Sequence, residues 1–227
     1  MPLEPAIIAE GFGYLEAARW HEDALYFSDI RDRRIYRLHG DGSCDVVADI
    51  AARPSGLGWT PTGALMVIGM EDDTLNRLGT DGKIVASTPL EDAVIHPNDM
   101  VIDRHGRAYI TQFGYDLFGH APVAECGLLM IDAAGVKHKF GCGLTFPNGI
   151  ALSADGRMLV VAESFGHRLT AFDVAPDGSL SGQRIFADFG DSETAVPDGI
   201  CMDSGGAIWV GFSMAGQSCR ILSGGEG

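Results

Sequence analysis

Five polar residues recur along the chain at similar intervals and in one local context. They are Glu16, Ser55, Asn98, Asn148 and Asp198, separated by 39, 43, 50 and 50 residues. If the fold brings equivalent positions of a repeat together, their side chains supply two carboxylates and two carboxamides to one point. Such oxygen atoms are the ligands that Ca²⁺, Mg²⁺ and Mn²⁺ prefer. The spacing therefore predicts a divalent cation site.

A simpler interpretation applies to each of these residues taken alone, because Asn and Asp commonly stabilise turns that follow a proline. Glu16 argues against that interpretation for the set, since Glu is a poor turn residue yet occupies the same position of the repeat. Two buried carboxylates would also repel each other without a cation between them.

The repeat that carries these residues predicts short β-strands. Its clearest copies are HPNDMVIDRHG (96–106), FPNGIALSADG (146–156) and VPDGICMDSGG (196–206), with weaker copies at 53–63 and 14–24. Each copy is followed by three further apolar runs, separated by hairpin-type turns such as Asp-Gly and Gly-Gly. Four strands per repeat at a period of 40–50 residues indicate an all-β fold, a β-propeller built from four-stranded antiparallel blades.

We interpret residues 1–227 as a single propeller domain with about five readable blades. Residues 5–12 resemble the fourth strand of a repeat, so we expect them to form an outer strand that closes the ring. The last repeat lacks its own fourth strand. A ring of five blades and a ring with a sixth blade outside this sequence both remain open.

Composition narrows the possible partners. The net charge of −15 disfavours nucleic acid, whose phosphates an acidic surface repels. The N-terminus has no basic segment, and the longest clean apolar run, residues 64–70, is far too short to cross a membrane. The five cysteines form no CxxC pair, which favours reduced thiols. We expect a cytoplasmic protein with a small-molecule substrate.

Two long connections are expected on the face where the five polar residues meet. They span residues 112–126 and 190–196. Long loops above a polar centre predict a lid over a pocket. Tyr115, Phe118 and His120 on the first loop are candidates to line it.

Four segments carry a family resemblance: LEAARWHEDALYFSDI, HPNDMVIDRHGRAYITQFG, FPNGIALSADGRMLVVAES and VPDGICMDSGGAIWV. In this order they resemble the senescence marker protein 30/gluconolactonase/luciferin-regenerating-enzyme family. The resemblance implies a six-bladed propeller with one divalent cation at the top of its axis, Ca²⁺ first, with Mg²⁺, Mn²⁺ or Zn²⁺ as further options. It also implies lactone hydrolysis, which many members of the family perform.

The resemblance assigns a role to each matching position. Glu16, Asn148 and Asp198 match the metal ligands, and Asp198 also matches the proposed general base. Asn98 matches a position that helps to hold substrate. His96 stands where sugar lactonases often have Arg, so it is a second substrate-binding candidate. The chain departs from the family pattern at two points. The family's usual Glu-Gly-Pro is replaced by Glu-Ala-Ala at residues 16–18, and the family's sixth blade has no counterpart in this sequence.

The leading hypothesis is therefore a metal-dependent hydrolase that opens a lactone or related cyclic ester, with Asp198 as general base. The sequence has no GxSxG elbow of a serine hydrolase. The alternative is a propeller that binds a divalent metal or a small ligand without catalysis, because fold does not establish activity. A protein-interaction propeller has less support, since the sequence shows no extended apolar or charged face that would mark one.

Overall fold

The computed structural model describes residues 6–190 and 192–222, which form nineteen strands in five antiparallel sheets and no helix. The first sheet contains β1 (Leu15–His21), β2 (Ala24–Asp29), β3 (Arg34–His39) and β4 (Cys44–Asp49). The second contains β5 (Pro54–Trp59), β6 (Leu65–Gly69), β7 (Thr74–Leu78) and β8 (Ile84–Pro89). The third contains β9 (Pro97–Ile102), β10 (Ala108–Gln112), β11 (Glu125–Ile131) and β12 (Lys137–Thr145). The fourth contains β13 (Pro147–Leu152), β14 (Met158–Glu163), β15 (Arg168–Val174) and β16 (Leu180–Asp188). The fifth contains β17 (Pro197–Met202), β18 (Ile208–Phe212) and β19 (Gln217–Ile221).

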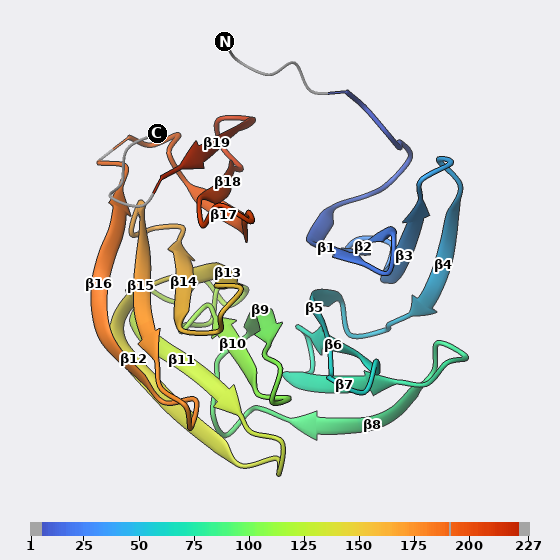
Figure 1. Ribbon diagram of the computed structural model, residues 1–227, viewed down its shortest axis with the longest axis horizontal. Helices are drawn as coiled ribbons and strands as arrows, with labels where there is room; N and C mark the ends of the chain where they lie inside the picture. Colours follow the sequence, from blue (N-terminus) through green and yellow to red (C-terminus); the bar gives the residue numbers. More distant parts are fainter. Residues whose placement is uncertain (1–5, 191, 223–227) are drawn as a thin grey trace.

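The five sheets stand around a common axis as the blades of a propeller (Figure 1). In each blade the strands follow sequence order from the innermost to the outermost. The innermost strands β1, β5, β9, β13 and β17 lie next to one another around the axis. The prediction of an all-β propeller with about five blades is confirmed. None of the described residues belongs to a helix that could span a membrane.

The hydrophobic core lies between neighbouring blades. Leu57 and Val67 of the second blade pack with Ile35 of the first. Val160 of the fourth blade packs with Ile208 and Val210 of the fifth in the same way. Strands buried on both faces explain the continuous apolar runs of the repeat, because the second, third and fourth blades each pack between two others. In these three blades the angular position of the innermost strand is thereby fixed by two interfaces.

The ring has a groove between its first and last blades. It encloses about 1450 Å³ and is lined by Leu25 and Leu38 of the first blade and by Trp209 and Cys219 of the fifth. Figure 1 shows the N-terminal segment and β19 on the two sides of this opening. The fifth blade has three strands within the described residues, in agreement with the missing fourth strand of the last repeat.

The expectation that residues 5–12 close the ring as an outer strand differs from the structure. Residue 5 lies outside the described residues, and 6–12 form no strand. Phe12 instead packs edge-on against Phe27 and Tyr36 of the first blade, with ring centroids 5.0 and 5.1 Å apart. Asp29 accepts hydrogen bonds from the next two backbone N–H groups, those of residues 13 and 14. These contacts hold the segment on the first blade.

Glycines allow the innermost strands to approach at backbone distance. A Cβ on Gly56 of β5 would lie 2.7 Å from the backbone nitrogen of Met100 in β9. A Cβ on Gly149 of β13 would lie 2.7 Å from the nitrogen of Ile200 in β17 and would also meet the carbonyl oxygen of Asp198. Gly199 occupies the equivalent place in β17, but a Cβ there would meet no atom within 4 Å, because this strand faces the groove.

The different surroundings of Gly149 and Gly199 give a matched pair of predictions. Gly149→Ala should lower the free energy of unfolding by about 2–3 kcal/mol, since the methyl group collides with rigid backbone. Gly199→Ala should leave it unchanged or raise it by up to about 1 kcal/mol, because the unfolded chain loses freedom and the folded chain gains no clash. Urea denaturation of both variants measures this. Equal losses would show that β17 is packed as tightly as β13.

Candidate metal and substrate site

The five polar residues of the repeat occupy one structural position. Each is the second residue of an innermost strand, namely Glu16 in β1, Ser55 in β5, Asn98 in β9, Asn148 in β13 and Asp198 in β17. At each of them the register of the innermost strand shifts against its neighbour. Such a bulge bends the strand and re-aims a side chain. The repeat thus places these residues at the same end of the propeller axis.

Glu16 and Asp198 lie close enough to oppose each other's ionisation. Burial, followed by the charges of Asp198 and Asp99, raises the pKa of Glu16 to about 8. Burial also raises the pKa of Asp198 from its ordinary value. One oxygen of Asp198, Oδ1, is buried and has no hydrogen-bond partner among the described residues. Two carboxylates from the first and fifth blades therefore lie close together, and neither forms an ion pair among the described residues; the charge of Arg19 only partly offsets that of Glu16.

Asn148 links the third, fourth and fifth blades. Its Oδ1 accepts a hydrogen bond from Nδ2 of Asn98 at 2.8 Å. Its Nδ2 donates to Oγ of Ser164 at 3.1 Å, and that hydroxyl donates to the carbonyl oxygen of Pro197 at 2.8 Å. These bonds fix which end of the amide is the oxygen. An amide oxygen has two lone pairs, so one remains for a further partner.

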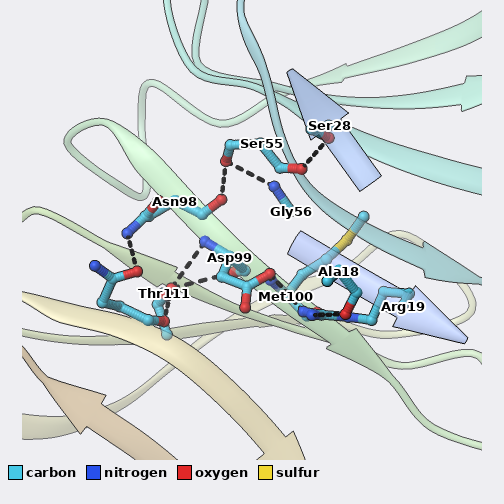
Figure 2. A network of polar contacts seen from close by, with 10 residues as sticks. Ala18, Arg19, Ser28, Ser55, Gly56, Asn98, Asp99, Met100 and Thr111 are labelled. Carbon is cyan, nitrogen blue, oxygen red and sulfur yellow. Dashed lines mark hydrogen bonds and ion pairs between the residues drawn. The ribbon is translucent and has the colours of Figure 1, made fainter. Parts of the chain in front are cut away.

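Ser55 has a different role from the other four. Its side chain is buried, and its hydroxyl donates to the carbonyl oxygen of Asn98, while its own carbonyl accepts a bond from Oγ of Ser28 at 2.6 Å. Figure 2 shows these bonds, which join the first three blades. Ser55 is therefore a structural member of the ring and does not line the cavity described below.

A second polar network crosses the axis and was not predicted. Nη2 of Arg19 in β1 donates to Oδ1 of Asp99 in β9 at 2.6 Å and to the carbonyl oxygen of Met100 at 3.1 Å (Figure 2). Thr111 donates to the carbonyl oxygen of Asn148 at 2.8 Å. The only sequence signal for this network was Asp99 itself, which replaces the glycine that follows the polar residue in the other Pro-containing copies.

A cavity of about 600 Å³ opens beside the converging residues. Glu16, Asn98, Asn148 and Asp198 line it together. Of the residues expected on the 112–126 loop, Phe118 lines it, whereas Tyr115 is buried against Phe146, with 6.0 Å between their ring centroids. His120 does not line the cavity as the structure describes it.

His96 lies next to the cavity and does not line it. Its ring packs against Phe113 and Phe118, which do, with centroids 6.1 and 5.1 Å away. Its nitrogens lie 3.6 Å from a carboxylate oxygen of Asp73 and 3.4 Å from one of Asp116. Direct contact of His96 with a substrate stays a prediction. In this structure it supports two aromatic rings of the wall.

The oxygen donors at the axis fit a divalent cation. Glu16 and Asp198 offer two carboxylates, one of them with an unpartnered buried oxygen, and Asn148 offers an oriented amide oxygen. Among the described residues no group of three or more His, Cys, Asp or Glu side chains is placed to hold a metal, so the donor set depends on Asn148. A set made only of oxygen suits Ca²⁺, Mg²⁺ or Mn²⁺ better than Zn²⁺.

Comparison with known proteins gives relatives over most of the chain. Regucalcin of Pongo abelii is 26% identical over 191 residues, which cover 81% of this chain and 55% of that protein. A pentonolactonase of Haloferax volcanii is 26% identical over 202 residues, which cover 86% of this chain and 65% of that protein. The chain thus spans between half and two thirds of the length of these curated relatives.

Solved structures with the same fold include a gluconolactonase from Xanthomonas campestris. Its TM-score is 0.81 at 26% identity, with 96% of this chain and 76% of that chain covered. A regucalcin from Agrobacterium tumefaciens, described as a calcium-binding protein, has a TM-score of 0.79 at 19% identity and covers 95% of this chain and 73% of that chain. At that identity the second likeness concerns the fold alone.

The family profile for the SMP-30/Gluconolactonase/LRE-like region matches residues 15–226. This range begins one residue before Glu16 and includes all five innermost strands. The chain therefore belongs to the SMP-30/gluconolactonase/LRE-like family.

Proposed function

We propose that the protein is a divalent-cation-dependent hydrolase that opens a lactone or a related cyclic ester. The observation that carries this proposal is the pair Glu16 and Asp198, two neighbouring carboxylates that form no ion pair among the described residues, at one end of a cavity. A gluconolactonase and a pentonolactonase among the similar proteins support the reaction class. The oxygen-only donor set favours Ca²⁺ as the cation.

Glu16, Asn148 and Asp198 would hold the cation, which when bound supplies a positive charge that polarises an ester carbonyl. Asp198 lies at the cavity, where its carboxylate can accept the proton of an attacking water. Asn98 uses one N–H of its amide on Asn148, so its second N–H is available to a substrate oxygen. Hydrogen bonds to Ser164 hold Asn148 in place while these steps occur.

A propeller that binds a cation or a small ligand without turnover is the second candidate. The regucalcins among the relatives favour it, because their names state no enzymatic activity. Both candidates need the same ligands, so turnover separates them. Cation binding without hydrolysis of any lactone in a broad panel would favour the second candidate.

Substitution of the proposed base gives a direct test. Asp198→Asn should lower kcat on lactones by about 10²–10⁴-fold at saturating Ca²⁺, because the amide cannot accept the proton. Asp155→Asn is the matched control, since Asp155 lies in the exposed turn after β13 and should leave kcat unchanged. A pH-stat assay measures hydrolysis, and circular dichroism checks the fold. Full turnover by the Asp198 variant would contradict its role as general base.

The raised pKa of Glu16 predicts how stability depends on pH without a cation. The folded protein favours protonated Glu16, so this group's contribution is complete below its ordinary pKa of 4.5 and is lost as pH rises through about 8. When a chelator removes divalent cations, the free energy of unfolding of the wild type should therefore fall relative to that of Glu16→Gln as the pH rises from 4.5 to about 8. Added Ca²⁺ should reduce this fall, because it compensates the carboxylate charge. Urea titrations at several pH values measure both curves, and parallel curves would contradict the prediction.

A further inference from the structure

The two ends of the cavity differ in chemistry. The axial end carries the carboxylates and carboxamides described above. The remaining wall is mostly apolar. Its main apolar members are Ile30, Met70, Phe113, Phe146, Phe165 and Met214.

Phenylalanine rings make up a continuous part of this wall. Phe113 and Phe146 stack with centroids 4.5 Å apart and an interplanar angle of 12°. Phe165 continues the row, with its centroid 4.6 Å from that of Phe146. Phe113 and Phe146 are buried and pack with Met70 in one hydrophobic cluster. The inner part of the wall is therefore preformed.

The outer part of the wall exposes large apolar side chains. Phe165 is 44% exposed, Phe118 is 49% exposed and Met214 is 68% exposed. All three line the same cavity from different connections of the propeller. Apolar surface gathered at the mouth of a pocket indicates a ligand or a partner that covers it. The adjacent polar end of a concave site favours a small ligand.

Two polar side chains on the wall, those of Arg53 and His167, already have partners in the protein. Nε of Arg53 lies 2.9 Å from a carboxylate oxygen of Glu71, and its guanidinium lies over the ring of Phe118. Nδ1 of His167 lies 3.0 Å from the carbonyl oxygen of Ala195. A polyhydroxylated sugar lactone would need a hydrogen-bond partner for each hydroxyl that it buries. Beyond Tyr14, Glu193 and Ser213, this wall offers few such partners and much apolar surface.

We infer that the substrate is a lactone that carries an apolar alkyl or aryl substituent. The inference rests on the proposed hydrolase function and names its substrate class. The lactone carbonyl would lie at the axial end and the substituent along Phe146 and Phe165. In the reaction the oxygen of water bonds to the acyl carbon, the ring C–O bond breaks, and the released oxygen takes a proton. The product is a hydroxy acid that bears the same substituent.

A set of lactones with one ring size tests this inference. δ-Valerolactone has no substituent, δ-decalactone adds a pentyl chain, dihydrocoumarin adds an aromatic ring and glucono-δ-lactone adds hydroxyl groups. We expect kcat/KM to rise about fourfold for each methylene of the chain that the wall covers. Glucono-δ-lactone should be the poorest substrate. The ratio of dihydrocoumarin to δ-decalactone tells an aryl from an alkyl preference, and either supports the inference.

Phe165→Ser removes one exposed ring of the wall without opening the buried cluster. The substitution should lower kcat/KM about tenfold for δ-decalactone and dihydrocoumarin. The kcat/KM for δ-valerolactone should stay nearly unchanged. Ile185→Ser is the matched control, because Ile185 is 56% exposed on the outermost strand β16 and does not line the cavity. This control variant should leave kcat/KM unchanged for all four substrates.

Calorimetry with a non-hydrolysable six-membered lactam, with and without a pentyl chain, separates this inference from the proposed function. Turnover that is best on glucono-δ-lactone, or an equal loss on all substrates in Phe165→Ser, would overturn the inference and leave the hydrolase in place. No turnover, but tighter binding of the pentyl lactam that Phe165→Ser abolishes, would overturn the hydrolase and support an apolar ligand site. Neither turnover nor binding would overturn both.

Discussion

Backbone contact between innermost strands is the constraint on which both the ring and the site depend. Gly56 and Gly149 let β5 and β13 lie directly against the strands of the next blade. The residue before each of them, Ser55 or Asn148, sits in a bulge that turns its side chain away from the regular alternation of a strand. Larger residues in place of these glycines would separate the strands and move the site residues apart. Packing of the strands and placement of the site residues therefore depend on the same short segment of the repeat.

Charge compensation around the axis is uneven, and this unevenness defines the site. Three carboxylates lie near one another, from Glu16, Asp99 and Asp198. Arg19 neutralises Asp99 in a short ion pair. Glu16 and Asp198 remain without a cationic partner among the described residues, which leaves a charge of about −2 when both are ionised. A divalent cation matches that charge, whereas a single Lys or Arg would match only half of it.

Much of the fold and the polar end of the site could be predicted from the sequence, because both follow from periodicity. A repeat that places Asn98, Asn148 and Asp198 at equal positions in successive blades must place them around one axis. The partners of Arg19 and Ser55 could not be predicted, because their bonds depend on distances across and around the axis that no local pattern encodes. The strand expected at 5–12 was wrong over 6–12 for a related reason. Its sequence resembles the fourth strand of a repeat, but Phe12 finds its apolar partners on the first blade.

The groove between the first and last blades has a consequence for how the ring is held together. Glu16 and Asp198 line both this groove and the cavity, and they lie more than 180 residues apart in the sequence. A cation bound to both would join the first innermost strand to the last, much as a cross-link closes a long loop of the chain. Cation binding would therefore couple the first blade directly to the fifth, through two side chains that lie near opposite ends of the described residues.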